Sequence, residues 1–210
     1  VMGYGSALIK LGIKYGLQEA KDFTDILFKE MFIHAVQTSV DIAGEKGSFP
    51  KYKECVFDSE IMKKHFSKKQ LKEFKTRGLR NSSLLSIAPA GSLSVLINVS
   101  GGIEPELFFK YKRKTESLVN NNIHYYDVVS KVYSDFIIKM NTSDLPDYFV
   151  TAHDIDYRDR IDIQSIIQEH VDTAISSTVN LKKETPLKDV EDLFLYAWEK
   201  GLKGITVFRD

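Results

Sequence analysis

The last third of the chain alternates between two residue patterns, and this alternation restricts the possible folds more than any other feature. Residues 176–181 and 204–208 are short and rich in β-branched and apolar residues, which predicts two strands. Residues 186–200 lie between them and carry apolar side chains at three- and four-residue steps, which is typical of a helix with one buried face. Another helix, capped by Asp154 or Asp156, precedes the first strand. Strands joined through helices pair in parallel, so the pattern predicts an α/β fold.

The beginning of the chain has a mainly helical pattern. Helices are predicted over residues 2–15 and 20–43, and a short basic helix follows Ser67, a favourable N-cap residue, as far as Thr76. The buried face of the second helix is predicted to consist of Phe23, Ile26, Leu27, Met31, Ala35, Val36, Val40 and Ala43.

The middle of the chain mixes the two patterns. Residues 83–88 are apolar and predict a buried strand, and residues 107–113 are compatible with a second one. Residues 123–140 place aromatic and β-branched side chains on one face of a predicted helix.

No linker, repeat or low-complexity run divides the chain. We therefore expect a single segment over residues 1–210, mainly helical over 1–80 and mixed over 81–210. Both ends are apolar, whereas the ends of natural domains are usually polar and loose. This pattern favours a segment of a longer polypeptide. The alternative is a small protein from which a tag and disordered tails were removed.

One short segment could bind a ligand through its backbone. Small residues at positions 89–94 let the main chain approach a ligand closely, and an open run of N–H groups can cradle a phosphate where a helix begins. No Gly-Lys-Ser/Thr follows, so this is not a Walker sequence. The alternative is a plain tight turn. The candidate phosphate-binding residues are Pro89, Ala90, Gly91, Ser92, Leu93 and Ser94.

A second candidate lies a few residues downstream, in the predicted loop 98–105. Gly101 and Gly102 permit positive φ angles, and Glu104 could accept hydrogen bonds from loop amides or from a sugar hydroxyl. The alternative is a flexible connection with a solvent-facing glutamate.

Charge and cysteine content exclude several classes of function. The chain has 29 Lys+Arg and 29 Asp+Glu, so binding to nucleic acid or membrane by bulk electrostatics is not expected. Its single cysteine, Cys55, excludes an internal disulfide and a cysteine-based zinc site, and we expect this thiol to be buried. The histidine spacing supports no metal site, and no apolar run is long enough to span a membrane. A cytoplasmic location is expected.

Three segments together resemble the large subunits of ribonucleotide reductases. Residues 80–83 and 87–94 resemble the Arg-Asn-Ser segment and phosphate loop of that family, and residues 100–105 resemble its Ser-Ser-Gly-Ile-Glu-Pro motif. Three further stretches, Gln168, residues 171–181 and residues 197–210, resemble the end of the class II, adenosylcobalamin-dependent branch. Class I enzymes carry a tyrosine pair near the last barrel strand, whereas the corresponding strand here contains no tyrosine.

The resemblance implies that the chain is the C-terminal portion of a ten-stranded α/β barrel, helix-rich at its N-terminal end. It also implies reduction of ribonucleotides through a thiyl radical that adenosylcobalamin initiates. The family's radical cysteine, asparagine and glutamate are expected upstream of Val1, so no catalytic residue and no metal ligand is assigned to this chain. In the family, the loop matching residues 89–94 binds substrate phosphates through backbone N–H groups. Ala90 replaces a usual threonine, a change that leaves the backbone amide intact.

The resemblance also implies supporting residues and partners. The residues expected to support the loop are Asn81, Ser82, Gly101 and Glu104. The expected partners are a ribonucleoside di- or triphosphate and the remainder of the reductase, with a homodimeric parent as one arrangement. No nucleic acid and no membrane are expected.

The chain on its own is predicted to have no reductase activity. Two alternatives remain open from the sequence: a stand-alone scaffold or regulatory module, and one chain of a split reductase.

Overall fold

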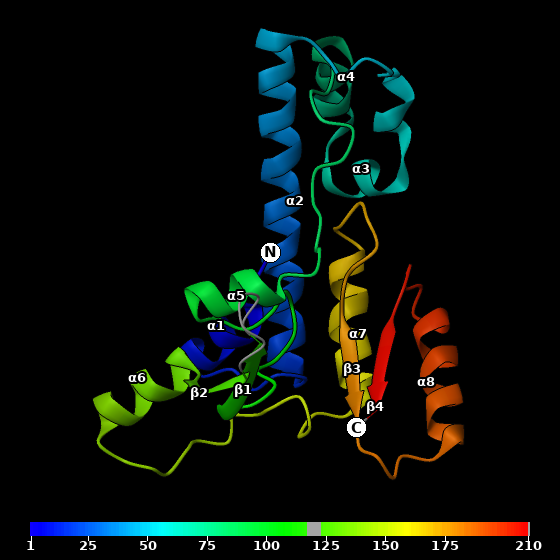
Figure 1. The fold of residues 1–210 in the computed structure, drawn as a ribbon. Helices are drawn as coiled ribbons and strands as arrows, with labels where there is room; N and C mark the ends of the chain where they lie inside the picture. Colours follow the sequence, from blue (N-terminus) through cyan, green and yellow to red (C-terminus); the bar gives the residue numbers. More distant parts are fainter. Residues whose placement is uncertain (117–122, 210) are drawn as a thin grey trace.

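The computed structural model describes residues 1–116 and 123–209, and a single long helix organises it (Figure 1). The first 80 residues hold α1 (Tyr4–Leu11), α2 (Gln18–Lys46), the 3-10 helix η1 (Glu54–Asp58), α3 (Glu60–His65) and α4 (Lys68–Arg77). Figure 1 shows α3 and α4 beside one end of α2, and α1 and α7 beside its other end. Ser67 caps α4 through a capping box with Gln70, as the sequence predicts.

The rest of the chain alternates helices and short strands. Its elements are α5 (Gly91–Ile97), β1 (Lys110–Glu116), β2 (Ile123–Val129), α6 (Lys131–Met140), α7 (Tyr157–Gln168), β3 (Thr178–Leu181), α8 (Leu187–Glu199) and β4 (Thr206–Arg209). β3 pairs in parallel with β4, with Thr178 opposite Thr206, and α8 connects the two strands. The predicted parallel pairing is confirmed, and the mixture of elements fits the α/β class. Each sheet in the described residues has two strands, so the ten-stranded barrel stays a prediction.

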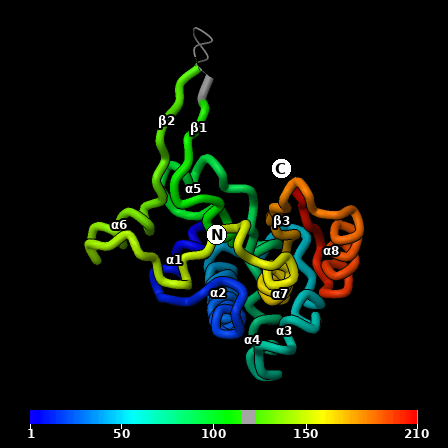
Figure 2. Tube along the Cα trace, turned by 90° about the horizontal axis from the view of Figure 1, so that it is seen from below, coloured from blue at the N-terminus to red at the C-terminus, as the bar shows by residue number. Residues whose placement is uncertain are grey.

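The predicted helix over residues 123–140 is wrong in its first half. Residues 123–129 form β2, which pairs antiparallel with β1 as a ribbon that projects from the body (Figure 2). Aromatic and β-branched side chains such as Tyr125, Tyr126 and Val128 favour an extended backbone, and pairing with β1 decides the outcome. Ser130 occupies the N-cap position of α6 without a side-chain capping bond, and the helical pattern is confirmed only from Lys131 onward.

Two other predicted elements are shorter than expected. The helix predicted over 2–15 ends at Leu11, because Gly12 adopts a left-handed conformation (φ 75°) that closes α1. The buried strand predicted over 83–88 is also wrong. Only Ile87 pairs, through a single parallel bridge to Ile175, and the preceding residues run as irregular backbone.

Helix α2 contributes side chains to two hydrophobic cores. Phe28 lies in one core with Tyr4, Leu8 and the buried face of α7, whereas Phe32 lies in the next core with residues of η1, α3 and α4. The buried face predicted for this helix is only partly confirmed. Val36, Val40 and Ala43 are buried as predicted, but Ile26 is 62% exposed, and Phe28 and Phe32 are the fully buried aromatic residues.

A charged cluster joins α2 to α7 and α8. The Asp162 carboxylate accepts hydrogen bonds from Lys21 Nζ (2.8 Å), Lys200 Nζ (2.8 Å) and the Tyr196 hydroxyl (2.7 Å). Burial alone would raise the pKa of Asp162, but these three donors outweigh it and lower the pKa to about 2.

We expect Asp162→Asn to lower the free energy of unfolding by about 2 kcal/mol at pH 7. Because the folded pKa lies below the usual value of 3.8, the contribution of Asp162 is present above that value and is lost as the pH falls through about 2. Urea denaturation of both proteins between pH 7 and pH 2 measures the difference. Asp159→Asn is the control, since Asp159 is more exposed and contacts only Lys21 in this cluster. A constant difference across the pH range would contradict the prediction.

Candidate functional site

The segment of residues 89–94 leads directly into a helix. Ala90 is the N-cap of α5, which begins at Gly91. The Ser94 N–H donates to the Ala90 carbonyl (2.8 Å), and its hydroxyl donates to the Gly91 carbonyl (3.0 Å), so the turn is closed from within. The N–H groups of Gly91, Ser92 and Leu93 belong to the first turn and have no intrahelical acceptor.

This first turn of α5 is open to solvent. Gly91, Ser92 and Leu93 are exposed, whereas Ser94 is buried. A Cβ atom built on Gly91 would meet no atom within 4 Å apart from its chain neighbours and the backbone of its own helix, so the space beside the turn is free. Unpaired N–H groups at a helix start, next to open space, can accept an anion. The sequence analysis predicted that residues 89–94 could cradle a phosphate where a helix begins. In the structure, α5 begins within this segment, at Gly91.

The downstream loop returns to the same place. Asn98 ends α5 in a left-handed conformation, and the Val99 N–H donates to the Ser94 carbonyl (2.9 Å). A Cβ atom on Gly101 would lie 3.6 Å from Glu104 Oε2 and 3.9 Å from Ser94 Oγ. The structure therefore brings Gly101 and Glu104 together with the end of the 89–94 segment.

Glu104 has a structural contact that the sequence did not suggest. Its Oε1 accepts a hydrogen bond from the Thr178 N–H at 2.6 Å, so the carboxylate holds the first residue of β3. The sequence pattern left open a solvent-facing glutamate or one that binds loop amides. In the structure this side chain is half-buried, and it joins the loop to the parallel strand pair.

Helix α1 anchors this loop from the other side. The Ser6 N–H donates to Ser100 Oγ (3.1 Å), the Ser100 N–H donates to Ser6 Oγ (2.8 Å), and the Ser6 hydroxyl donates to Glu106 Oε1 (2.7 Å). Burial raises the pKa of Glu106, and the hydrogen bond from Ser6 opposes that shift. Sequence patterns gave no signal for these contacts, because they join residues about 100 positions apart.

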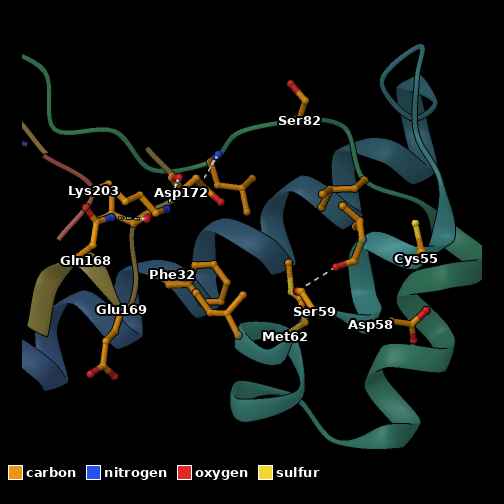
Figure 3. Close-up of a pocket in the computed structure, with 15 residues that line it drawn as sticks. Phe32, Cys55, Asp58, Ser59, Met62, Ser82, Gln168, Glu169, Asp172 and Lys203 are labelled. Carbon is orange, nitrogen blue, oxygen red and sulfur yellow. Dashed lines mark hydrogen bonds between the residues drawn. The ribbon is translucent and has the colours of Figure 1, made fainter. Parts of the chain in front are cut away.

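Asn81 and Ser82 have other contacts. Ser39 of α2 donates its hydroxyl to Asn81 Oδ1, and the Asn81 N–H donates to Ser39 Oγ, both at 3.0 Å. Ser82 lines a hollow of about 640 Å³ whose floor includes Phe32 and Met62 (Figure 3). No hydrogen bond within the described residues joins Asn81 or Ser82 to the 89–94 segment.

The same hollow contains a positioning residue that sequence analysis missed. Asp172 Oδ2 accepts hydrogen bonds from the Leu84 and Leu85 N–H groups, both at 2.8 Å, while Lys203 Nζ donates to the Asp172 carbonyl (Figure 3). These contacts fix the irregular segment that leads to residues 89–94. In the sequence, Asp172 was marked only by its position within the motif of residues 171–181.

The prediction that Cys55 is buried is wrong. Its side chain lies at the edge of the 640 Å³ hollow and is exposed (Figure 3). Cys55 belongs to η1, a single short turn in which Phe57 supplies the buried side chain. In this single turn Phe57 is buried and Val56 is partly buried, whereas Glu54, Cys55 and Asp58 are exposed.

Within residues 1–116 and 123–209, no group of three or more His, Cys, Asp or Glu side chains is placed to hold a metal ion. No helix in the same ranges has the length and apolar character needed to cross a bilayer. Asp210, the last residue of the terminal motif, lies outside the described residues.

Comparison with known proteins gives a consistent result. A family model described as "Ribonucleotide reductase, barrel domain" matches residues 1–208. The vitamin B12-dependent ribonucleoside-diphosphate reductases of Thermoplasma acidophilum and Mycobacterium tuberculosis are each 26% identical to the whole chain, which covers 28% and 30% of their lengths. The ribonucleoside-diphosphate reductase subunit alpha of Treponema pallidum is also 26% identical over the whole chain, which covers 24% of that protein. The chain thus spans less than a third of the relatives it matches.

Proposed function

Because this chain belongs to the ribonucleotide reductase barrel-domain family, we propose that it forms part of the catalytic barrel of a reductase that converts ribonucleotides to deoxyribonucleotides. In this proposal residues 89–94 bind the phosphates of the substrate through backbone N–H groups, and Gly101 and Glu104 support that loop. The substrate is a ribonucleoside di- or triphosphate.

The observation that carries this proposal is the open first turn of α5. Three N–H groups without an intrahelical acceptor lie next to space that even a Cβ atom on Gly91 would not fill. No basic side chain is required, which agrees with the equal numbers of acidic and basic residues in the chain. Loop amides hold phosphate locally, and their positions survive the replacement of a usual threonine by Ala90.

The names of two relatives extend the proposal to a vitamin B12 cofactor, adenosylcobalamin. When bound to a parent enzyme, this cofactor supplies the radical that starts the reaction. The chain covers less than a third of the length of these relatives, and no observation on its described residues points to a contact with a corrin ring. We therefore assign no residue of this chain to the cofactor and derive no step through it.

The proposed partner of this chain is the remainder of the reductase barrel. α5 exposes Leu93, Leu96 and Ile97 beside the proposed loop, and Leu96 is 79% exposed. Apolar side chains that gather next to a binding loop suit a surface that further barrel elements cover. A second chain could supply those elements as well, as in a split reductase. Within this assembly we propose that residues 1–210 act as one segment, mainly helical over 1–80 and mixed over 81–210.

We expect Gly91→Leu to weaken ribonucleotide binding at least 10-fold. The leucine side chain would occupy the free space beside the N–H groups of α5, and the phosphate would lose its approach to the backbone. Isothermal titration of the purified protein with a ribonucleoside diphosphate and with the matching triphosphate measures the effect and separates the two substrate classes.

Gly44→Leu provides the matched control. Gly44 is a helical glycine of α2, and a Cβ atom there makes only ordinary contacts with Arg77 at 3.7 Å. This variant should bind nucleotide as the wild type does. Equal affinity of the Gly91→Leu variant, or no nucleotide affinity in the wild type, would overturn the proposed loop and favour a scaffold or regulatory module.

A further inference from the structure

Two histidines meet where the helical beginning of the chain touches the turn after α7 (Figure 1). The rings of His65, the last residue of α3, and His170 lie with their centroids 5.2 Å apart. His170 is fully buried and His65 is half-buried. The His65 ring also packs against Phe32 of α2, at a centroid distance of 5.6 Å. The two imidazoles therefore form part of a contact between segments that are far apart in the sequence.

Hydrogen bonding leaves each of these rings with one covered nitrogen. His170 Nε2 lies 2.9 Å from Asp25 Oδ1, and because an ionised carboxylate only accepts, this nitrogen carries the proton. His170 Nδ1 and His65 Nε2 are buried and have no hydrogen-bond partner among residues 1–116 and 123–209. A charged imidazole has an N–H on both nitrogens, so protonation of either ring would leave a buried donor without an acceptor. The contact therefore favours two neutral rings.

The charges around His65 also favour its neutral form. The titratable and charged groups that surround this ring are Asp25 and Lys29 of α2, Lys64 of α3, and Glu169 and His170 at the end of α7. Burial lowers the pKa of His65, and the positive groups lower it further, whereas Asp25 opposes them. The Glu169 carboxylate is already paired with Lys64, at 2.6 Å between Oε2 and Nζ.

Acid should weaken this contact. Folding lowers the pKa of His65 below the ordinary value of 6.5 that the ring has in an unfolded chain. The stabilisation that the neutral ring contributes is therefore present above pH 6.5, and it is lost as the pH falls through the folded pKa. Histidine is the side chain whose charge normally changes in this pH range.

The two segments that the histidines join also border the 640 Å³ hollow (Figure 3). Met62 of α3 lines it, and so does Asp172, which belongs to the turn after α7. The Asp172 carboxylate accepts the N–H groups of Leu84 and Leu85, both at 2.8 Å. If the turn moved away from α3, Asp172 would move with it, and the segment that leads to the proposed substrate loop would lose these hydrogen bonds.

We propose that the contact between His65 and His170 is an acid-sensitive latch. With both rings neutral, it holds α3 against the turn after α7. Protonation of His65 releases the turn, so that the hollow widens and Leu84 and Leu85 are no longer held by Asp172. None of residues 89–94 lines this hollow, so the latch does not require that loop to bind phosphate.

The direct test follows the His65 ring of the wild-type protein by NMR spectroscopy. Its Cε1–H resonance is titrated with pH in the folded protein and again in the protein unfolded in urea. We expect the midpoint of the titration to lie at a lower pH in the folded protein, because burial and the neighbouring cations disfavour the charged ring. A midpoint at the same or a higher pH in the folded protein would overturn the proposal.

Urea denaturation of the wild type and His65→Phe at pH 7 and pH 5 gives the second test. Phenylalanine keeps an aromatic ring at this position but cannot be protonated. Between pH 7 and pH 5, the unfolding equilibrium constant of the wild type should rise roughly threefold or more beyond that of the variant. His34→Gln is the control, since it removes an exposed histidine of α2 and should leave the acid-dependent loss in place. Equal pH dependence of the wild type and His65→Phe would contradict the latch.

Hydrogen exchange separates a local latch from general destabilisation by acid. At pH 5, after correction for intrinsic exchange rates, the wild type should lose amide protection in α3, in residues 168–172 and at Leu84 and Leu85, whereas α8 keeps its protection. His65→Phe should keep its protection in all four segments. An equal loss of protection in α3 and α8 of the wild type would show that acid destabilises the whole chain, and it would overturn the latch.

Discussion

Replacement of Gly5 by alanine should lower the free energy of unfolding by about 3 kcal/mol or more. Gly5 lies in α1, where the helix meets the loop that contains Glu104. A Cβ atom there would be 2.5 Å from the Glu104 carbonyl oxygen and 2.8 Å from Pro105 Cα. Both neighbours are backbone atoms, so neither can rotate away, and α1 would have to separate from the loop. The buried contacts between Ser6 and Ser100 would be lost with it.

The Gly5→Ala variant should also bind ribonucleotide less tightly, because Glu104 and Gly101 would move together with the loop. Urea denaturation followed by circular dichroism measures the stability, and titration with a ribonucleoside diphosphate measures the binding. Gly44→Ala is the control, since alanine at this interior helical position has room and should stabilise the protein by up to about 1 kcal/mol. Equal stability of the two variants would show that α1 does not contact the loop as described.

The sequence predicted secondary structure correctly where a periodic apolar pattern agrees with the tertiary packing. β3, α8 and β4 lie where the alternating pattern of residues 176–208 predicts them, because the buried face of β3 and the inner face of α8 carry apolar side chains at regular steps. Ser67 was identified as an N-cap because that role depends on residues only three positions away. Such local rules need no knowledge of distant segments.

Prediction failed where a distant segment decides the structure. Residues 123–129 satisfy a helical and an extended pattern about equally, and only the pairing with β1 selects the strand. Ile87 is held by one bridge to Ile175, a partner 88 positions away, and the short pairing does not extend to a strand.

The candidate site shows the same division. The open turn at Gly91 could be inferred from small residues alone, because the backbone conformation of such a segment depends on local sequence. The contact of Glu104 with Thr178 and the hydrogen bonds of Asp172 could not be inferred. Each depends on how α7 and the strand pair are placed against the loops, and no periodicity in the sequence encodes that placement.

Helix α2 offers the sharpest comparison between sequence pattern and structure, and it leads to the last prediction. Phe32→Ala should lower the free energy of unfolding by about 4 kcal/mol, because a fully buried aromatic ring would leave a cavity. The ring packs against His65 and Phe66, with centroid distances of 5.6 and 6.4 Å. Ile26→Ala should change stability by only about 0.5 kcal/mol, since that side chain is 62% exposed.

The two variants distinguish the orientation of α2 from the one that its apolar pattern predicts, in which Ile26 faces the core. Urea denaturation measures both stabilities, and hydrogen exchange locates the change. Because Phe28 and Phe32 of the same helix lie in two different cores, the loss in the Phe32→Ala variant should reduce amide protection in α4 and also in α7. An equal loss of unfolding free energy in the Phe32→Ala and Ile26→Ala variants would show that the face predicted from the apolar pattern, which includes Ile26, is buried. Reduced protection confined to α4 would show that the first 80 residues unfold separately from the rest of the chain.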